Sequence, residues 1–270
     1  MMKTMLIRSV SGAVYVALIV GTTLMHPMAI AAVLAVIALI SMQELMQMME
    51  QNGVPVSRGA TFAGAVVLFS GYATSLTAGD ERLILPAVGM AGVAPFIWEL
   101  LTTRQPSFKR SSRSLVAVIY IGTPLVLLVQ SAFYQAYFQP YLLLGIFVFA
   151  WTNDTFAYLT GSMIGKHKLM PAVSPKKTIE GLLGGALFAL AGGWLFAYFN
   201  DDLNLWQWMT LAAIVVVFGT LGDLSESVIK RNYNVKDSGQ IMPGHGGFLD
   251  RIDGLLFIGP AVYAFLILFR

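Results

Sequence analysis

Apolar stretches long enough to cross a bilayer recur along the whole chain, and short polar stretches separate them. A membrane-spanning helix needs roughly 20 predominantly apolar residues. The pattern therefore predicts an all-α, polytopic integral membrane protein with about nine transmembrane helices. Their expected ranges are 8–24, 28–49, 59–78, 83–102, 114–133, 140–161, 178–199, 205–229 and 252–269.

The composition supports this interpretation. The chain is 57% hydrophobic and 11% charged, with a mean hydropathy of +0.72, whereas soluble domains carry about 25% charged residues. The absence of cysteine excludes disulfides, thiolate metal sites and a cysteine nucleophile. The net charge of +3 is small and forms no basic nucleic-acid-binding face, so no nucleic acid partner is expected.

The first apolar stretch, 8–24, resembles a signal peptide in having Lys3 and Arg8 at its start. No convincing cleavage site follows it, and the next apolar stretch begins almost at once. We therefore interpret it as a retained helix. Because the connections are short, residues 1–270 are expected to form a single transmembrane domain. Its N-terminal helices lie within about 1–135, and its catalytic helices and loops lie within about 140–270.

Positive charge is distributed unevenly between the two sides. Loops that face the cytoplasm carry an excess of Lys and Arg. If the N-terminus is cytoplasmic, every Lys and Arg except Arg82 and Arg270 falls on the cytoplasmic side. The loops 162–177 and 230–251 then share that side, where they could act on a cytoplasmic phosphate compound.

The most polar stretch runs from Gly219 to Asp253 and interleaves acids, bases and glycines. Carboxylates can hold Mg²⁺, while cations and free backbone N–H groups can hold phosphate oxygens. The stretch is therefore typical of a metal-assisted phosphate site. Its candidate residues are Asp223, Ser227, Lys230, Arg231, Lys236, His245, Gly246, Gly247, Asp250, Arg251 and Asp253.

Asp223, Glu226, Ser227 and Lys230 are spaced so that they share one helical face. Asp223 is expected within membrane depth, where ionisable groups are costly and usually functional. This favours Asp223 as a metal ligand. Glu226 and Lys230 could instead form an ion pair on the surface, one turn apart.

Asp250 and Asp253 lie at the start of the last span and could bind metal or cap that helix. Arg251 could bind phosphate or anchor the helix at the interface. In the turn at 243–247, two adjacent glycines would allow the backbone to approach an anion closely. His245 could contact phosphate or a base edge, or simply cap that turn.

A second polar cluster precedes this one. Asp154 lies inside the span 140–161 and is a further candidate metal ligand. Lys176 and Lys177 precede the span 178–199 and could bind a triphosphate or a lipid phosphate, or act only as cytoplasmic anchors. The residues that could cap that span are Ser174, Thr178 and Glu180.

Two acids lie apart from these clusters. Glu44 and Glu99 are near the ends of the spans 28–49 and 83–102. We interpret both as buried partners or interface groups.

The spacing of the polar residues resembles the signature of phosphatidate cytidylyltransferases, also called CDP-diacylglycerol synthases. The resemblance covers about 30 residues, and the run 174–181 is similar to that family too. The matching segments are 222–227, 227–231, 236–237, 245–247 and 250–253. The residues alone indicate only metal-assisted phosphoryl or nucleotidyl chemistry at the cytoplasmic membrane face.

The resemblance implies a reaction in phospholipid biosynthesis, in which CTP and phosphatidate give CDP-diacylglycerol and diphosphate with Mg²⁺. It implies a multi-pass protein of the bacterial inner membrane with its active site facing the cytoplasm, and it allows a homodimer. The expected catalytic residues are Asp223, Asp250, Lys230, Arg231 and Arg251. The expected metal ligands are Asp223, Asp250, Asp253 and Asp154. The expected substrate contacts are Lys176, Lys177, Ser227, Lys236, His245, Gly246 and Gly247.

Two other functions remain as alternatives. A CTP-dependent lipid-alcohol kinase would transfer the γ-phosphoryl group of CTP to an alcohol. A cation-coupled transporter would use acids within the membrane. Transporters usually place paired broken helices near the midplane, whereas the acids and bases here gather at one face.

Overall fold

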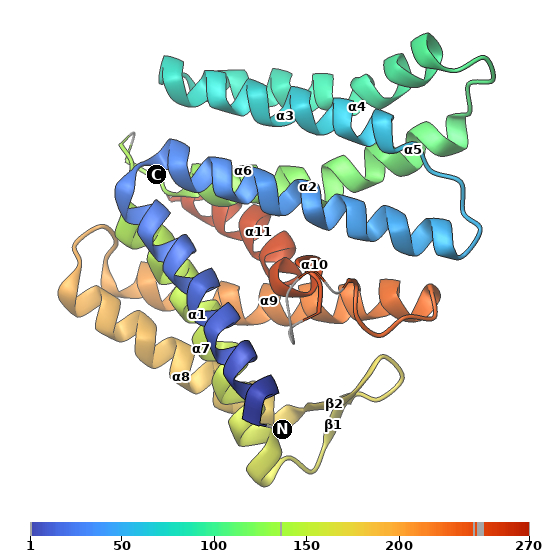
Figure 1. Cartoon of the computed structure of the whole chain (residues 1–270). Coiled ribbons are helices and arrows are strands. Elements are labelled where there is room, and N and C mark those ends of the chain that lie inside the picture. The colour runs from blue at the N-terminus through green and yellow to red at the C-terminus, as the bar shows by residue number, and fades with distance from the viewer. Residues whose placement is uncertain (1, 136, 240, 242–245, 270) are drawn as a thin grey trace. The chain divides into compact units, whose positions relative to one another are not determined.

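The structure is a computed structural model that describes residues 2–135, 137–239, 241 and 246–269, with side chains from Val10 onward (Figure 1). In this part of the chain, eight helices are long and apolar enough to cross a membrane, and a shorter apolar helix precedes them over Val10–Met25. The predicted all-α, polytopic membrane protein is confirmed. The helices divide between two compact units, each of which is described by itself.

The first unit contains residues 1–127 and 232–252. It consists of α1 (Met2–Met25), α2 (Pro27–Gln51), α3 (Arg58–Ala78), a short 3₁₀ turn η1 (Glu81–Leu83), α4 (Ile84–Thr102), α5 (Phe108–Ala117), a π-helical turn η2 (Val118–Gly122) and the four-residue α10 (Leu249–Ile252). The helix α6 (Thr123–Ser131) continues from η2 and passes into the second unit.

The second unit contains residues 128–231 and 253–270. It consists of α7 (Pro140–Ile164), the strands β1 (Lys168–Met170) and β2 (Ser174–Thr178), α8 (Ile179–Phe199), α9 (Leu205–Asn232) and α11 (Leu255–Leu268). The two antiparallel strands form a hairpin that joins α7 to α8 (Figure 1). The sequence predicted a loop at 162–177, and the two strands were not foreseen.

Local sequence explains where several helices begin and end. Pro27 and Pro140 lie in the first turns of α2 and α7, where a missing backbone N–H is tolerated. The side chains of Ser57 and Thr178 cap α3 and α8. Gly79 ends α3 with a left-handed backbone (φ 64°) that favours glycine.

Small residues allow neighbouring helices to approach closely within each unit. In the first unit, α3 and α4 lie side by side (Figure 1), and a Cβ at Gly71 would lie 2.5 Å from the Cβ of Ala87. In the second unit, α7 and α8 lie side by side, and a Cβ at Gly181 would lie 2.7 Å from the carbonyl oxygen of Ala157. Glycines in these helices therefore serve packing.

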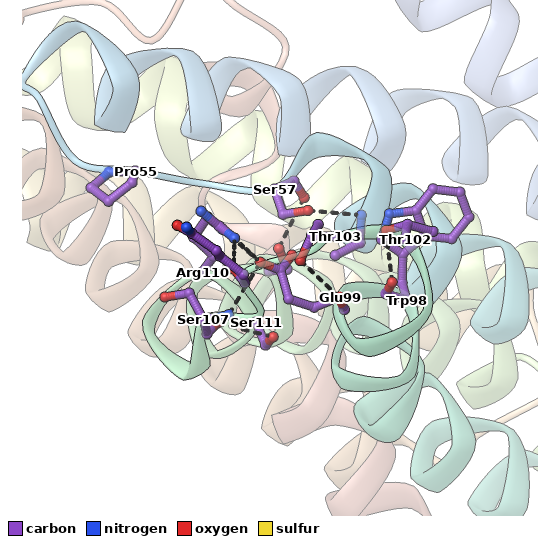
Figure 2. A network of polar contacts seen from close by, with 12 residues as sticks. Pro55, Ser57, Trp98, Glu99, Thr102, Thr103, Ser107, Arg110 and Ser111 are labelled. Atoms are coloured by element: carbon purple, nitrogen blue, oxygen red, sulfur yellow. Dashed lines mark hydrogen bonds and ion pairs between the residues drawn. The ribbon is translucent and has the colours of Figure 1, made fainter.

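The connection between α4 and α5 is held by a buried carboxylate. Glu99 is 1% exposed and forms an ion pair with Arg110, whose Nε donates to Glu99 Oε1 at 2.6 Å. The backbone N–H of Ser107 donates to the same oxygen at 3.3 Å. Figure 2 shows Glu99 and Arg110 facing each other across this turn. The interpretation of Glu99 as a buried partner is confirmed.

Two of the expected spans differ in detail. The span expected at 114–133 begins earlier, because the mostly polar segment Phe108–Arg113 already forms the first turns of α5. The span expected at 252–269 is interrupted by a turn at Asp253 and Gly254, which separates α10 from α11. This break matters because it contains a candidate metal ligand.

Candidate active site

The predicted site residues fall into two polar clusters, one in each unit. The α9 cluster, in the second unit, comprises Asp154, Lys177, Asp223, Lys230 and Asp253. The loop cluster, in the first unit, comprises Glu44, Ser238 and Asp250 with the backbone of Gly247–Leu249.

Asp223 is the centre of the α9 cluster. It lies on α9, and its Oδ2 forms an ion pair with the Nζ of Lys177, which β2 carries. Its Oδ1 accepts a hydrogen bond of 3.4 Å from the Ser227 hydroxyl, one turn along the helix. The structure thus brings together three of the predicted site residues: an acid, a cation and a hydroxyl group.

Two further carboxyl groups belong to this cluster. Asp253 lies in the turn before α11, and its Oδ1 accepts a hydrogen bond of 2.7 Å from the Gly254 N–H. The Asp253 carboxyl group interacts electrostatically with Asp223, Asp154 and Lys230. Asp154 lies on α7, where its Oδ1 accepts a hydrogen bond of 3.5 Å from the side-chain amide of Asn153. Asp253 therefore lies within electrostatic range of two of the other predicted metal ligands, Asp223 and Asp154.

The turn that carries Asp253 reaches α9 because α9 presents glycines there. A Cβ at Gly222 would lie 3.2 Å from the carbonyl carbon of Asp253 and 2.9 Å from the Cα of Gly254. Gly219, one turn earlier, lies in contact with Gly254 as well. The glycines before Asp223 are thus required by the close approach of two backbones, which places Asp253 beside α9.

Lys230 and Glu226 form the predicted ion pair on α9. The pair is buried: the side chain of Glu226 is 0% exposed and that of Lys230 is 11% exposed. The alternative of a surface ion pair is therefore right about the two partners and wrong about their location. A buried ammonium and carboxylate depend strongly on each other, because removing one leaves the other charge uncompensated.

The hairpin is fixed to the start of α8. The Glu180 carboxylate accepts hydrogen bonds from the backbone N–H groups of Lys166 and His167, and it lies 2.6 Å from the His167 Nδ1. Thr178 Oγ1 accepts a hydrogen bond of 3.1 Å from the Gly181 N–H, so it is Thr178 that caps the helix. This attachment determines where β2 presents Lys177, while Lys176 is exposed.

The loop cluster is built around two carboxylates. Asp250 Oδ2 accepts hydrogen bonds of 2.9 Å from the backbone N–H and the hydroxyl group of Ser238, and another of 2.9 Å from the Gly247 N–H. Glu44 Oε1 accepts from the Phe248 N–H at 3.0 Å, and its Oε2 accepts from the Leu249 N–H at 2.9 Å. Together they hold the polar stretch between α9 and α10.

The glycines of the 245–247 segment approach these carboxylates directly. A Cβ at Gly246 would lie 2.7 Å from Asp250 Oδ2, and its φ of 83° favours glycine in any case. A Cβ at Gly247 would lie 2.5 Å from Glu44 Oε2. The backbone of these glycines thus approaches the protein's own carboxylates. Their close approach to a ligand stays a prediction. His245 lies outside the described residues.

The remaining predicted cations lie on the surface of their units. Arg231 is exposed at the end of α9, and Lys236 and Arg251 are exposed in the first unit. Sequence reasoning gave Glu44 no role at this site. An isolated acid in an apolar helix was the available signal, but its partner Ser238 is 194 residues away, so no local pattern connects them.

The α9 cluster offers oxygen donors to a divalent cation. Among the described residues, no group of three or more His, Cys, Asp or Glu side chains is arranged to hold a metal ion by itself. Mg²⁺ is usually held by one or two carboxylates together with phosphate oxygens and waters. Asp223 and Asp253 supply hard oxygen donors of that kind, so the cluster fits Mg²⁺ bound jointly with a phosphate substrate.

Comparison with known proteins gives a consistent result. A model of the Cytidylyltransferase family matches residues 6–269. The chain is 41% identical over 172 residues to the phosphatidate cytidylyltransferase of Staphylococcus aureus (strain COL), an alignment that covers 63% of this chain and 64% of that protein. It is 36% identical over 195 residues to the phosphatidate cytidylyltransferase of Staphylococcus epidermidis, covering 70% of this chain and 73% of the relative.

The aligned part thus spans just under two thirds of the length of the Staphylococcus aureus relative. The family model, in contrast, covers nearly the whole of this chain. The predicted site residues, from Asp154 to Asp253, lie within that match. The chain therefore belongs to the cytidylyltransferase family.

Proposed function

We propose that the protein is a phosphatidate cytidylyltransferase, which converts CTP and phosphatidate to CDP-diacylglycerol and diphosphate in phospholipid biosynthesis. The observation that carries the proposal is the α9 cluster, where Lys177 is paired with Asp223 and where Asp253 and Asp154 lie within electrostatic range. Such a mixture of acids and cations suits a metal-bound polyphosphate. Family membership and the names of the relatives support CTP and phosphatidate as the substrates.

In the proposed reaction, a phosphate oxygen of phosphatidate attacks the α-phosphorus of CTP in line. The bond between the α-phosphorus and its bridging oxygen to the β-phosphorus breaks, and diphosphate leaves with that electron pair. Phosphatidate is already an anionic nucleophile, so no covalent enzyme intermediate is needed. The protein has to bring two polyanions together and stabilise charge on the leaving group.

In the proposal, different cations bind different phosphate groups of the two substrates. Lys230, Arg231, Lys236 and Arg251 neutralise phosphate oxygens. Lys176 and Lys177 serve the lipid phosphate or the triphosphate, with Lys177 oriented by Asp223 before substrate binds. The Ser227 hydroxyl donates to a phosphate oxygen or keeps its contact with Asp223. The N–H groups of the 245–247 segment remain candidate phosphate contacts, although that of Gly247 donates to Asp250.

Asp223 and Asp253, with Asp154 nearby, are the proposed ligands for Mg²⁺. The bound ion would neutralise and orient the triphosphate. Asp250 remains a predicted ligand. Its Oδ2 accepts three hydrogen bonds from its own loop, and this matches the capping alternative, although a carboxylate can accept hydrogen bonds through one oxygen and bind metal through the other.

The proposed location is the bacterial inner membrane, with the N-terminus and the active site on the cytoplasmic side. The distribution of Lys and Arg supports this orientation. The acyl chains of phosphatidate would remain in the bilayer while its phosphate reaches the site. A homodimer stays a prediction.

Product analysis tests the proposed reaction against the kinase alternative. Purified protein in detergent, given CTP, Mg²⁺ and phosphatidate, is expected to release diphosphate and to form a lipid heavier by one cytidylyl group. Release of CDP together with a phosphorylated lipid alcohol would assign the protein to the kinases instead. Failure of folded protein to use CTP with either lipid would favour the transporter.

A further inference from the structure

We propose that Glu44 is a positioning residue for the substrate-binding loop, an inference that rests on the proposed function. The loop is the segment 236–251, which carries Lys236, Asp250 and Arg251. Glu44 lies on α2, which contributes none of the predicted substrate contacts. It would therefore influence CTP binding only through the loop that it holds.

The Glu44 carboxylate is buried and uses both oxygens. It is 2% exposed, and its oxygens accept the backbone N–H groups of Phe248 and Leu249 at 3.0 and 2.9 Å. N–H groups at the start of a helix have no partner within it, and negative charge is favoured beside them. Glu44 thus fixes the start of α10 against the side of α2.

Ser238 links Glu44 to Asp250. The Ser238 hydroxyl lies 3.3 Å from Glu44 Oε2 and 2.9 Å from Asp250 Oδ2, and its backbone N–H donates to Asp250. Asp250 in turn accepts the Gly247 N–H. A change at Glu44 would therefore move both the predicted metal ligand Asp250 and the glycine segment before it.

The packing leaves this arrangement little freedom. A Cβ at Gly247 would lie 2.5 Å from Glu44 Oε2, and a Cβ at Gly239 would also meet the Glu44 carboxylate. The loop backbone therefore lies directly on Glu44 at two points. Since a misplacement of about 1 Å at a distance from the chemistry can lower a rate about 100-fold, the fixed position of the loop has a functional consequence.

A carboxylate, and not an amide, is required by this geometry. In the described part of the loop, each Glu44 oxygen accepts a backbone N–H group, from Phe248 and from Leu249. The Ser238 hydroxyl, which donates to Asp250 at 2.9 Å, also lies 3.3 Å from Glu44 Oε2. Glutamine has the same shape, but its NH₂ group would face one of these N–H groups. Glu44→Gln therefore tests the hydrogen bonds with little change in volume.

The experiment compares Glu44→Gln and Ser238→Ala with two matched controls. Glu99→Gln removes another buried carboxylate of the first unit, which pairs with Arg110 away from this loop. Glu50→Gln removes an exposed carboxylate from the same helix, where it pairs with Arg58. Hydrogen exchange of peptides from 236–252, and separate kcat and KM values for CTP and phosphatidate, are measured for each protein.

Glu44→Gln is expected to speed exchange in 236–252 by about tenfold or more and to raise the KM for CTP by about tenfold, because charge-assisted hydrogen bonds are lost. Exchange in α3 and α4 should stay unchanged. Ser238→Ala, which keeps both backbone contacts to Glu44, should have a smaller effect in the same direction. The two control variants should retain the wild-type KM for CTP.

Unchanged exchange in 236–252 would overturn the proposed attachment. Faster exchange with unchanged CTP kinetics would show that Glu44 is only structural, which also overturns the positioning role. If Glu44→Gln fails to fold, hydrogen exchange in 236–252 and the CTP kinetics of Ser238→Ala decide whether the positioning role holds. If wild-type protein forms no CDP-diacylglycerol, the proposed function fails and the CTP role with it, while the exchange data still test the attachment independently.

Discussion

At the scale of single residues, the α9 cluster places like charges close together. Asp253 interacts with two other acids, Asp223 and Asp154, while Lys177 and Lys230 supply compensating charge. Acids near one another are stabilised by a cation between or beside them. This is why we assign a functional role to Asp223 and Asp253, beyond a contribution to helix packing.

Asp223→Asn is expected to reduce turnover by at least about 100-fold, as loss of a group that stabilises transition-state charge does elsewhere. The amide cannot replace the negative charge that a metal ion needs. Turnover is measured on purified protein, with Asp201→Asn as the control, since Asp201 is an exposed acid in the loop before α9. Near-normal turnover of folded Asp223→Asn protein would rule out the metal role.

The buried pair of Glu226 and Lys230 makes a second prediction at this scale. Glu226→Leu alone should destabilise the protein by about 3–5 kcal/mol, because it removes the carboxylate that forms an ion pair with a buried ammonium group. Adding Lys230→Met should recover most of that loss. Thermal unfolding in detergent measures both effects.

The double variant also separates stability from catalysis. If Lys230 neutralises a substrate phosphate, the recovered protein should remain inactive. Recovery of activity together with stability would mean that Lys230 serves only the fold.

At the scale of elements, glycines on α9 determine where the turn between α10 and α11 can lie. A Cβ at Gly222 would meet the backbone of Asp253 and Gly254. Gly222→Ala would therefore push the turn, and the carboxylate of Asp253 with it, away from α9. The helix itself has no need of glycine at this position.

Gly222→Ala is expected to cost about 1–3 kcal/mol of stability through overpacking and to reduce turnover by more than about tenfold. Gly89→Ala is the control, because a Cβ at Gly89 in α4 would have no neighbour within 4 Å. That change should be neutral or slightly stabilising, since alanine favours helix more than glycine. Equal effects of both changes on turnover would contradict the packing argument.

The same elements show what the sequence could predict. The long apolar stretches predicted the helices. A segment inside the bilayer must be apolar and must form its own backbone hydrogen bonds, whichever helices lie beside it. Hydropathy did not reveal the break at Asp253 and Gly254, because it lies at the edge of the last apolar stretch, next to the charged residues Asp250 and Arg251. The hairpin was missed because strands of three and five residues leave no clear periodicity.

The sequence likewise predicted only part of the candidate site. The spacing on α9 identified Asp223 and Ser227 as neighbours, and the structure confirms that contact. Glu44 was not predicted as a site residue because its contacts with 238–249 join residues about 200 positions apart. Such contacts depend on tertiary packing, which one sequence does not reveal.

At the scale of the whole molecule, the chain crosses between its two compact units within α6, at the end of α9 and between Ile252 and Asp253. The segment 250–253 therefore contributes Asp250 to the first unit and Asp253 to the second. Residues three apart in sequence thus belong to different polar clusters. The position of each carboxylate is set by the unit that holds it.

The orientation of the whole molecule can be tested directly because the chain has no cysteine. Single cysteines are introduced as Lys166→Cys, in the loop expected in the cytoplasm, and Asp201→Cys, in a loop expected outside; both positions are exposed. A membrane-impermeant maleimide should label Asp201→Cys in intact cells, and Lys166→Cys only after permeabilisation. The opposite pattern would reverse the proposed orientation.

The proposed reaction attaches the α-phosphorus of CTP to phosphatidate. We would therefore follow α-phosphorus-labelled CTP into the lipid phase with purified protein, phosphatidate and Mg²⁺. We expect labelled lipid that disappears on chelation of the metal and in Asp223→Asn protein. Label that enters lipid only when it is carried on the γ-phosphorus, with an alcohol as acceptor, would contradict it.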